Sequence, residues 1–331
     1  MRKFSPGLII FLVLFFSAAF SVFGINLAAP FRSLDLTGRA KTLPDPSPVV
    51  VYVALPTPTT TPLPTPTPTP APTPTVGPTS TPKPTPKPTS PPLSGPPGTG
   101  LTRATVVTPK GNFSATILSV DLNSSRMITD TGNDGNCGTD CTVLSLQDYV
   151  TRNNGFAGVN GTYFCPATYP DCASKKNSYD FPVYNTRLGH WINQDKLSWG
   201  ERRAIVYVDG SGVHYLHNAN SFSGSLTAGV VNYPGLVDGS NIQIDENQSG
   251  LSDKQKAKGT KVGIGVRDNH TVMVVIAANV NMHEFAHVFK SLGATGALNL
   301  DTGGSTAMIS SGRYVYGPGR ALPNAVVFAA K

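Results

Sequence analysis

Two stretches near the C-terminus combine residue types and spacings that could do chemistry. The first is MHEFAH at 282–287, in which His283, Glu284 and His287 follow the order H-E-x-x-H. On a helix, this spacing places two imidazoles on one face with a carboxylate beside them, which is the signature of a zinc peptidase. The first hypothesis for this stretch is therefore a metal-dependent peptidase.

A zinc site of this kind needs a third protein ligand. The longer metzincin pattern asks for Gly and then His further along, where Lys290 and Gly293 stand, and no Glu follows Glu284. Asp301 could serve only if the strand after the helix folded back against it. A structural interpretation competes, because Asn281 is a good N-cap and Glu284 stands where a capping-box carboxylate belongs. We favour the structural interpretation.

The second stretch is ALNLDTGGSTAM at 297–308, in which Asp301 precedes a Gly-Gly pair and two hydroxyl residues. Glycines allow close approach of the backbone to a ligand. Adjacent N–H groups and hydroxyls can cradle an anion such as phosphate, with Asp301 as nucleophile or base beside it. The alternative is a tight turn that Asp301 caps. The candidate binding residues here are Gly303, Gly304, Ser305 and Thr306.

Both stretches belong to one predicted β-α-β unit. Strand TVMVVIAAN (271–279) precedes helix MHEFAHVFKSLG (282–293), and strand ATGALNLD (294–301) follows it. Ligands of such units tend to lie beyond the carboxyl ends of the strands. Asp301 falls at that position, so the helix serves to deliver it.

The remainder of the chain from Leu101 has a globular composition, with short β-rich runs separated by Gly, Asn and Asp. We predict one α+β domain over 101–331, with mixed sheets and few helices. The stretch 175–199 is expected to be an ordered loop near the site. The expected strands cover 102–108, 113–122, 203–210, 213–218, 260–266, 271–278 and 324–330, and the helices 143–154 and 282–294.

The first hundred residues do not have a globular composition. Arg2 and Lys3 precede an apolar run over 7–30, which is long for a signal peptide and long enough to span a membrane. We predict an N-terminal transmembrane anchor at 1–33, with a cleaved signal peptide and secretion as the alternative. Residues 34–100, rich in Pro and Thr, are predicted to be a disordered, extended stalk. The folded domain is thus expected to be extracytoplasmic and membrane-anchored.

Charge excludes one class of partner. The net charge of +7 divides into 7 Lys/Arg against 2 Asp/Glu before residue 101, and 19 against 17 after it. The folded part is nearly neutral, which argues against nucleic acid. Lys83 and Lys87 in the stalk could contact anionic cell-wall polymers, although simple solvation also accounts for them.

The four cysteines lie close together in the expected extracytoplasmic part. An even number there favours disulfides, and four cysteines allow three connectivities. We favour the local pairs Cys137–Cys141 and Cys165–Cys172. A zinc site made from them is disfavoured because the spacings are not those of zinc ribbons.

The motif NLDTGGST within 297–308 resembles the N-L-D-G-G-G-S-T signature of the phosphodiester glycosidase family. Further stretches fit that family in order: AGVNGTYF (157–164), GTKVGIGV (259–266) and GRALPNAVVF (319–328), with a looser match at 228–240. The resemblance covers most of the chain from Leu101 onward and none of the stalk.

By position, the resemblance implies a catalytic site that contains Asp301 and Asn160. Asn160 is also the start of an N-glycosylation sequon and could form a turn, but the resemblance favours contact with substrate. Arg320 and Lys261 are implied as phosphate clamps. The remaining implied binding residues are Gly303, Gly304, Ser305, Thr306 and Asn324.

Two departures bear on the substrate. Thr302 stands where the family usually has its first glycine. Lys261 stands where Arg is frequent, and it keeps the charge but loses the bidentate fork.

The resemblance implies a hydrolase that cleaves sugar-1-phosphodiester linkages. With the extracytoplasmic location expected from the N-terminal segment, its substrate would be surface or exopolysaccharide material. Asp301 would supply the carboxylate. The alternatives are a non-catalytic glycan-binding module on a stalk and the zinc peptidase. We assign no metal ligands, and no cofactor is required, while a divalent cation that helps to hold the phosphate stays open. Trp191, Trp199 and the tyrosines of 163–184 could stack on sugar rings, although core packing is the commoner use of aromatic residues.

Overall fold

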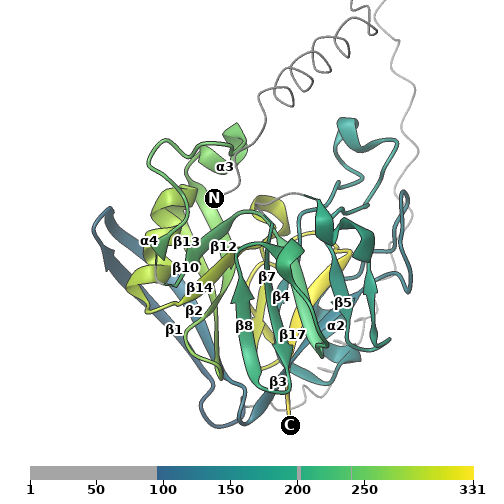
Figure 1. The fold of residues 1–331 in the computed structure, drawn as a ribbon, viewed down its shortest axis with the longest axis horizontal. Coiled ribbons are helices and arrows are strands. Elements are labelled where there is room, and N and C mark those ends of the chain that lie inside the picture. The colour runs from purple at the N-terminus through teal and green to yellow at the C-terminus, as the bar shows by residue number, and fades with distance from the viewer. Residues whose placement is uncertain (1–94, 200–202, 240) are drawn as a thin grey trace, which may run out of the picture. The chain divides into compact units, whose positions relative to one another are not determined.

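The structure is a computed structural model that describes residues 95–199, 203–239 and 241–331 (Figure 1). These residues all lie in one compact unit, Pro82–Lys331. The expected anchor at 1–33 and nearly all of the expected stalk at 34–100 lie outside the described residues. Within the described ranges, no helix has the length and apolar character needed to cross a membrane.

Three β-sheets make up most of the domain, and all hydrogen-bonded neighbours in the described part are antiparallel. The seven-stranded sheet has the order β1 (Gly100–Thr108), β2 (Gly111–Asp121), β13 (Thr271–Val280), β12 (Gly259–Val266), β14 (Gly296–Asn299), β10 (Gly235–Asp238) and β11 (Asn241–Ile242).

The other two sheets have five strands each. The second sheet has the order β16 (Arg313–Tyr316), β15 (Met308–Ser310), β4 (Gly155–Asn160), β17 (Asn324–Ala330) and β3 (Ser125–Thr131). The third has the order β6 (His190–Ile192), β5 (Val183–Asn185), β9 (Ala228–Asn232), β7 (Ala204–Asp209) and β8 (Gly212–Leu216). All three sheets contribute buried side chains to one core.

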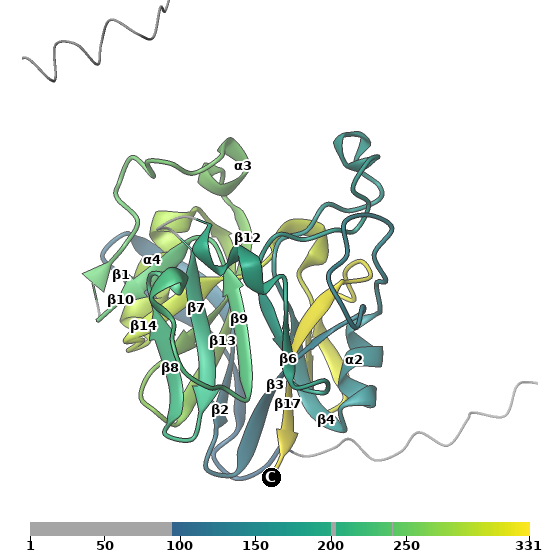
Figure 2. The same cartoon turned by 45° about the vertical axis from the view of Figure 1, so that its right-hand side comes forward.

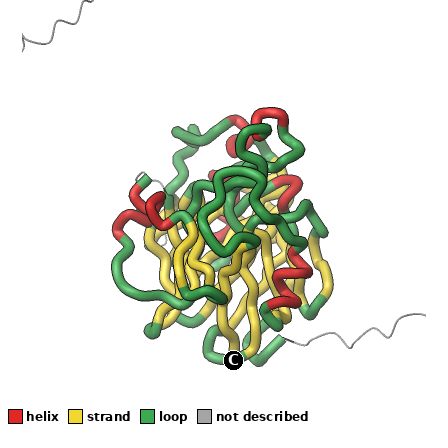
Figure 3. Tube along the Cα trace, turned by 90° about the vertical axis from the view of Figure 1, so that its right-hand side faces the viewer, coloured by secondary structure: helices red, strands yellow, loops and turns green. Residues whose placement is uncertain are grey.

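Helices are few and lie at the periphery of the strands (Figure 3). The α-helices are α2 (Leu146–Arg152), α3 (Asp253–Lys256) and α4 (Met282–Ser291). The 3-10 helices are η1 (Pro170–Cys172), η2 (Gln194–Ser198), η3 (Ala219–Ser221) and η4 (Gly303–Ser305). The predicted α+β class, a single domain dominated by sheets with few helices, is confirmed.

Strand β13 shows how the sequence pattern builds the core. Its side chains alternate between the two faces of the sheet. Val272, Val274 and Ile276 join the core shared by the three sheets. Met273 and Val275 point the other way and pack against α4. Both faces are thus buried, which explains why this strand is almost continuously apolar.

The glycines of β12 make room for α4. A Cβ at Gly263 would lie 2.9 Å from a ring carbon of Phe289, and one at Gly265 would lie 2.8 Å from the same ring. Phe285 approaches Gly263 in the same way, at 3.1 Å. The helix therefore packs directly on the backbone of β12, which fixes the position of the chain that follows it.

The predicted unit of strand β13, helix α4 and strand β14 is confirmed. In the sheet, β12 lies between its two strands. Strand β12 pairs with both β13 and β14, so these two flank it and run parallel to each other. Asn281 caps α4 in a full capping box with Glu284, as the structural interpretation predicted. Strand β14 then ends at Asn299, two residues before Asp301.

The seven predicted strands and both predicted helices occur in the structure, with boundaries that differ by a few residues. The expectation of a loop over 175–199 is wrong in part. Strands β5 and β6 form a short hairpin there and add an edge to the third sheet, and η2 follows them. The hairpin is only three residues deep on each side, too short for a clear alternating pattern.

Candidate active site

Asp301 opens onto a cavity of about 300 Å³ at one end of the domain. Figure 2 shows α3 and the loop around η1 projecting from this end, opposite the C-terminus. The cavity is lined by Tyr163, Phe164, Pro166, Tyr169, Ser252, Lys254, Gln255, Asp301, Thr302, Ser305 and Arg320.

The Asp301 side chain is almost fully buried, with 8% exposed. Burial disfavours the charged form and raises the pKa of this carboxyl to about 7. Hydrogen bonding from Ser305, the charge of Arg320 and the N–H of Thr302 each lower the pKa and only partly offset burial. Asp301 can therefore exchange a proton near neutral pH, as a general base must.

Asn160 fixes the backbone around Asp301. Its Nδ2 donates to the carbonyl oxygen of Asp301 at 2.7 Å, and its Oδ1 accepts from the N–H of Ala307 at 3.1 Å. The side chain is fully buried and is not among the cavity-lining residues. The structure thus places Asn160 behind the cavity, where it joins the two ends of the 301–307 segment. The expectation that its amide contacts substrate does not fit this position.

Asn324 holds the segment after Asn160 from the neighbouring strand. Its Oδ1 accepts from the N–H of Thr162 at 2.9 Å, and its Nδ2 donates to Oγ1 of the same residue at 3.0 Å. A Cβ at Gly161 would lie 1.9 Å from Oδ1 of Asn324. The N-G-T sequence at 160–162 therefore has a structural explanation, since only glycine fits between the two asparagines. Asn324 lies away from the cavity.

The two glycines after Asp301 serve different purposes. Gly303 has a φ of +71°, in the left-handed region that favours glycine. Gly304 faces Arg320, and a Cβ there would lie 2.3 Å from Nη2. The N–H of Arg320 also donates to the carbonyl of Gly304 at 3.0 Å. The Gly-Gly pair thus makes the turn and admits the guanidinium.

Ser305 lines the cavity, whereas Thr306 lies behind it. The Ser305 side chain lies close enough to Asp301 to lower the pKa of that carboxyl. Thr306 Oγ1 is buried with no hydrogen-bond partner among the described residues. Of the predicted binding residues, Ser305 and Arg320 reach the cavity together with Asp301.

Lys261 does not reach the cavity, contrary to its expected role as a phosphate clamp. Its side chain is only 3% exposed, and Nζ donates to the carbonyl of Lys254 at 3.2 Å. Burial lowers the pKa of this ammonium group. The lysine that lines the cavity is instead Lys254, on α3, seven residues earlier, and it stands there together with Arg320. Lys261 thus holds the backbone of α3 in place through this hydrogen bond.

Tyr163 lines the cavity, and it is one of the tyrosines of 163–184 that the sequence offered for stacking on a sugar ring. Its hydroxyl accepts from Nδ2 of Asn299 at 2.7 Å, and its N–H donates to Oδ1 of Asn232 at 3.1 Å. Burial raises the pKa of this phenol to about 12. A neutral Tyr163 next to Asp301 provides an aromatic face and a hydroxyl group at the reacting end of the cavity.

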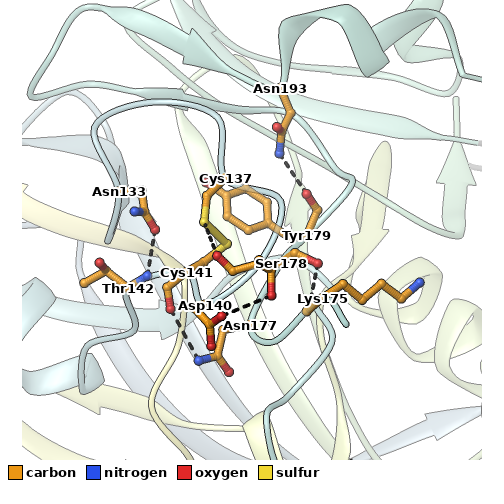
Figure 4. Close-up of a disulfide and its surroundings, with 11 residues drawn as sticks. Asn133, Cys137, Asp140, Cys141, Thr142, Lys175, Asn177, Ser178, Tyr179 and Asn193 are labelled. Atoms are coloured by element: carbon orange, nitrogen blue, oxygen red, sulfur yellow. Dashed lines mark hydrogen bonds between the residues drawn. A yellow bond between two sulfur atoms is a disulfide. The ribbon is translucent and has the colours of Figure 1, made fainter. Parts of the chain in front are cut away.

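Both predicted disulfides are confirmed, Cys137–Cys141 and Cys165–Cys172. Figure 4 shows the first with the 175–178 segment against it, and Asn177 donates to the carbonyl of Cys141 at 3.3 Å. The N–H of Asn177 in turn donates to the carbonyl of Cys165 at 2.6 Å. The two closed loops are thus connected, and the second one carries Tyr169 into the cavity wall.

The H-E-x-x-H helix lies apart from this cavity. His283 and His287 stack, with Nε2 atoms 2.9 Å apart, and Glu284 is occupied by the cap and by Lys258. Across residues 95–199, 203–239 and 241–331, no group of three or more His, Cys, Asp or Glu side chains is placed to hold a metal ion. The zinc peptidase hypothesis therefore lacks its third ligand.

The phosphodiester glycosidase family profile matches residues 153–329, which is more than half of the chain. This range contains Asp301, Arg320 and every other residue that lines the cavity. The chain therefore belongs to the phosphodiester glycosidase family. No curated protein matches it in sequence.

A solved structure of low sequence identity has the same fold. The catalytic domain of zebrafish N-acetylglucosamine-1-phosphodiester alpha-N-acetylglucosaminidase, auto-inhibited by its pro-peptide, has a TM-score of 0.54 and 14% identity, with 70% of this chain and 83% of that chain covered. A hypothetical protein from Synechocystis has a TM-score of 0.48 and 13% identity. The match covers 71% of this chain and 62% of the Synechocystis chain.

Proposed function

We propose that this protein is a hydrolase that cleaves the bond between the anomeric carbon of a sugar and a phosphodiester oxygen. The observation that carries the proposal is the position of Asp301. This carboxyl is buried, has a pKa near neutrality, and shares one cavity with the guanidinium of Arg320. Membership of the phosphodiester glycosidase family supports the same reaction.

One carboxylate is sufficient for the proposed hydrolysis. Water adds its oxygen to the anomeric carbon, and one of its protons passes to Asp301 acting as general base. The bond between that carbon and the phosphate oxygen breaks, and the phosphate monoester leaves with the electron pair. Such a leaving group needs less protonation than the alkoxide of an ordinary glycoside, for which a second carboxylic acid is used.

The residues that line the cavity suit a mechanism with a single carboxylate. Among the described residues that line it, Asp301 is the one carboxylate. Arg320 supplies donors for the phosphate, and charge-assisted hydrogen bonds from a guanidinium suit this anion. Tyr163, Phe164 and Tyr169 provide aromatic faces on which a sugar ring can stack. Asn160, Asn324 and Lys261 are proposed to act indirectly, by positioning Asp301, the 161–162 turn and α3.

We propose an extracytoplasmic location for this activity, with surface or exopolysaccharide material as the substrate. Two disulfides support an oxidising compartment. The membrane anchor at 1–33, cell-wall contact through the stalk, and the alternative of a secreted form remain proposals from the sequence.

The test is turnover of a sugar-1-phosphodiester by the full chain and by Asp301→Asn. We expect the wild type to release the free sugar and the phosphate monoester, and the variant to lose this activity. Binding of both proteins to the diester should be similar, because Arg320 is intact. Binding without turnover by the wild type would support the glycan-binding module and reject the hydrolase.

A further inference from the structure

We propose that Lys254 and Tyr169 form a second anion subsite, beyond the scissile phosphate held at Arg320. The subsite takes a further phosphate on the alcohol side of a glycosyl phosphodiester. This inference rests on the proposed function and names its substrate class: phosphate-linked chains of sugars or polyols, rather than isolated diesters.

Tyr169 is the shared element of the two cation sites. The Cζ atom of Arg320 lies 5.1 Å from the centroid of the Tyr169 ring, and Nζ of Lys254 lies 5.1 Å from the same centroid. Arg320 Nη2 also lies 3.4 Å from the Tyr169 hydroxyl. One exposed aromatic ring therefore holds two cations on the same wall of the cavity.

The cavity lining contains two cations, Arg320 and Lys254, and one carboxylate, Asp301. A phosphodiester carries one negative charge, and Arg320 next to Asp301 is sufficient to bind it. In the described part of the chain, neither Lys254 nor Arg320 is within ion-pair distance of a carboxylate. The Nη1 atom of Arg320 is buried and has no hydrogen-bond partner among these residues. Two cations are thus available to substrate.

The order of the groups assigns the subsites. Arg320 acts on the charge of Asp301, so the phosphate it binds lies next to the anomeric carbon. Tyr169 lies 5.1 Å from both Arg320 and Lys254, and of these two cations it is Arg320 whose charge acts on Asp301. A substrate with its sugar at Asp301 and its diester at Arg320 therefore continues along Tyr169 toward Lys254.

Both sides of the proposed subsite are preorganised. On one side, Ser252 and Gln255 form a capping box on α3, and Lys261 donates to the carbonyl of Lys254. On the other side, the Cys165–Cys172 disulfide closes the loop that presents Tyr169. A preorganised pair of groups loses less entropy when the ligand binds.

The test uses two matched substrates for the full chain, both sugar-1-phosphodiesters of propanediol, one with a free terminal hydroxyl and one with a terminal phosphate. The variants are Lys254→Gln and the control Lys256→Gln, which is on the same helix but does not line the cavity. We expect Lys254→Gln to reduce kcat/KM about fivefold to tenfold for the phosphorylated substrate only, through KM. Lys256→Gln should change neither.

Binding of propanediol monophosphate and propanediol bisphosphate by calorimetry separates this proposal from the proposed function. If neither diester is hydrolysed, the proposed reaction is wrong, while a preference for the bisphosphate that Lys254→Gln removes still supports the subsite. Equal affinity for the two ligands in the wild type overturns the subsite. So does an equal effect of Lys254→Gln on both ligands.

Discussion

Gly304 and Arg320 are in direct contact, since a Cβ on residue 304 would lie 2.3 Å from Nη2 of the guanidinium. This contact links the Gly-Gly turn to the cation that we assign to the phosphate. The glycine is therefore required for the position of a side chain that comes sixteen residues later in the sequence.

The change Gly304→Ala should displace the guanidinium from the cavity. We expect KM for a sugar-1-phosphodiester to rise about tenfold or more, because a charge-assisted contact with phosphate is lost. Gly303→Ala is the matched control, since a Cβ there meets open space but the φ of +71° is unfavourable for alanine. It should lower the melting temperature with little effect on KM. The reverse pattern would contradict the assignment of Arg320.

The activity should depend on the ionisation of Asp301. The carboxylate form acts as base, and its pKa in the free enzyme is about 7. We expect kcat/KM to rise with pH through about 7 and to level off above that value. The measurement is a kcat/KM profile on a sugar-1-phosphodiester. A rate that falls as pH rises through 7 would mean that the protonated acid is the active form.

The raised pKa of Asp301 should also make the stability of the fold depend on pH. Stability should fall as pH rises, whereas activity should rise. The pKa of Asp301 is about 7 when folded, against 3.8 for the ordinary value. Between these values the native state holds a proton that the unfolded state has lost, so this group's contribution to stability falls as pH rises from 4 to 7. Asp301→Asn lacks this dependence. Its free energy of unfolding relative to the wild type should therefore increase over that range and stay constant above it.

Urea denaturation of the wild type and Asp301→Asn at several pH values measures this difference. Asp171→Asn, which changes an exposed aspartate on the η1 loop, is the control and should follow the wild type. If Asp301→Asn unfolds more easily than the wild type at pH 8, the ionised carboxylate stabilises the fold, which contradicts a pKa raised by burial.

Asn160→Ala should affect both stability and rate. The change leaves the carbonyl of Asp301 and the N–H of Ala307 buried without partners, at a cost of about 1–3 kcal/mol for each group. We expect a lower midpoint in urea and a lower kcat, with KM less affected, because Arg320 does not contact Asn160. A variant with a changed KM and unchanged stability would instead place the amide on the substrate.

Removal of the Cys165–Cys172 disulfide should act mainly on one wall of the cavity. In a double Cys165→Ser and Cys172→Ser variant, the loop that carries Tyr169 loses its covalent closure. We expect KM for the diester to rise several-fold while β-sheet content is unchanged. The corresponding change at Cys137 and Cys141, further from the cavity, should have the smaller effect on KM. Equal effects would show that neither loop positions substrate.

The sequence predicted the fold where the pattern is local. The continuous apolar run of 271–278 and the capping box at Asn281 and Glu284 are features of neighbouring residues, and both are confirmed. The hairpin in 183–192 was missed because each of its strands has three residues. Its place is set by pairing with β9, in which Val183 faces Val230 and Tyr184 faces Gly229, far along the chain.

The site could be predicted only in part for a related reason. Asp301 follows from the strand that precedes it, but the direction of an amide or an ammonium group depends on distant neighbours. Asn160 donates to the carbonyl of Asp301, just after β14, and Lys261 donates to a carbonyl on α3. Both side chains therefore lie behind the cavity. Tyr169 lies on the loop closed by Cys165–Cys172 and Lys254 lies on α3, and no sequence spacing indicates that they meet.

Asn160 is followed directly by Gly161, and this dipeptide is the sequence most prone to spontaneous deamidation, because the glycine N–H readily attacks the asparagine amide. In the native fold both polar atoms of that amide are engaged, and the Gly161 N–H donates to the carbonyl of Asn324 at 3.2 Å. Folding thus protects the side-chain amide of Asn160 from deamidation. Once unfolded by heat, the chain loses that protection, and an aspartate formed at 160 cannot donate to the Asp301 carbonyl. A chain that refolds on cooling would then lack the hydrogen bond that positions Asp301.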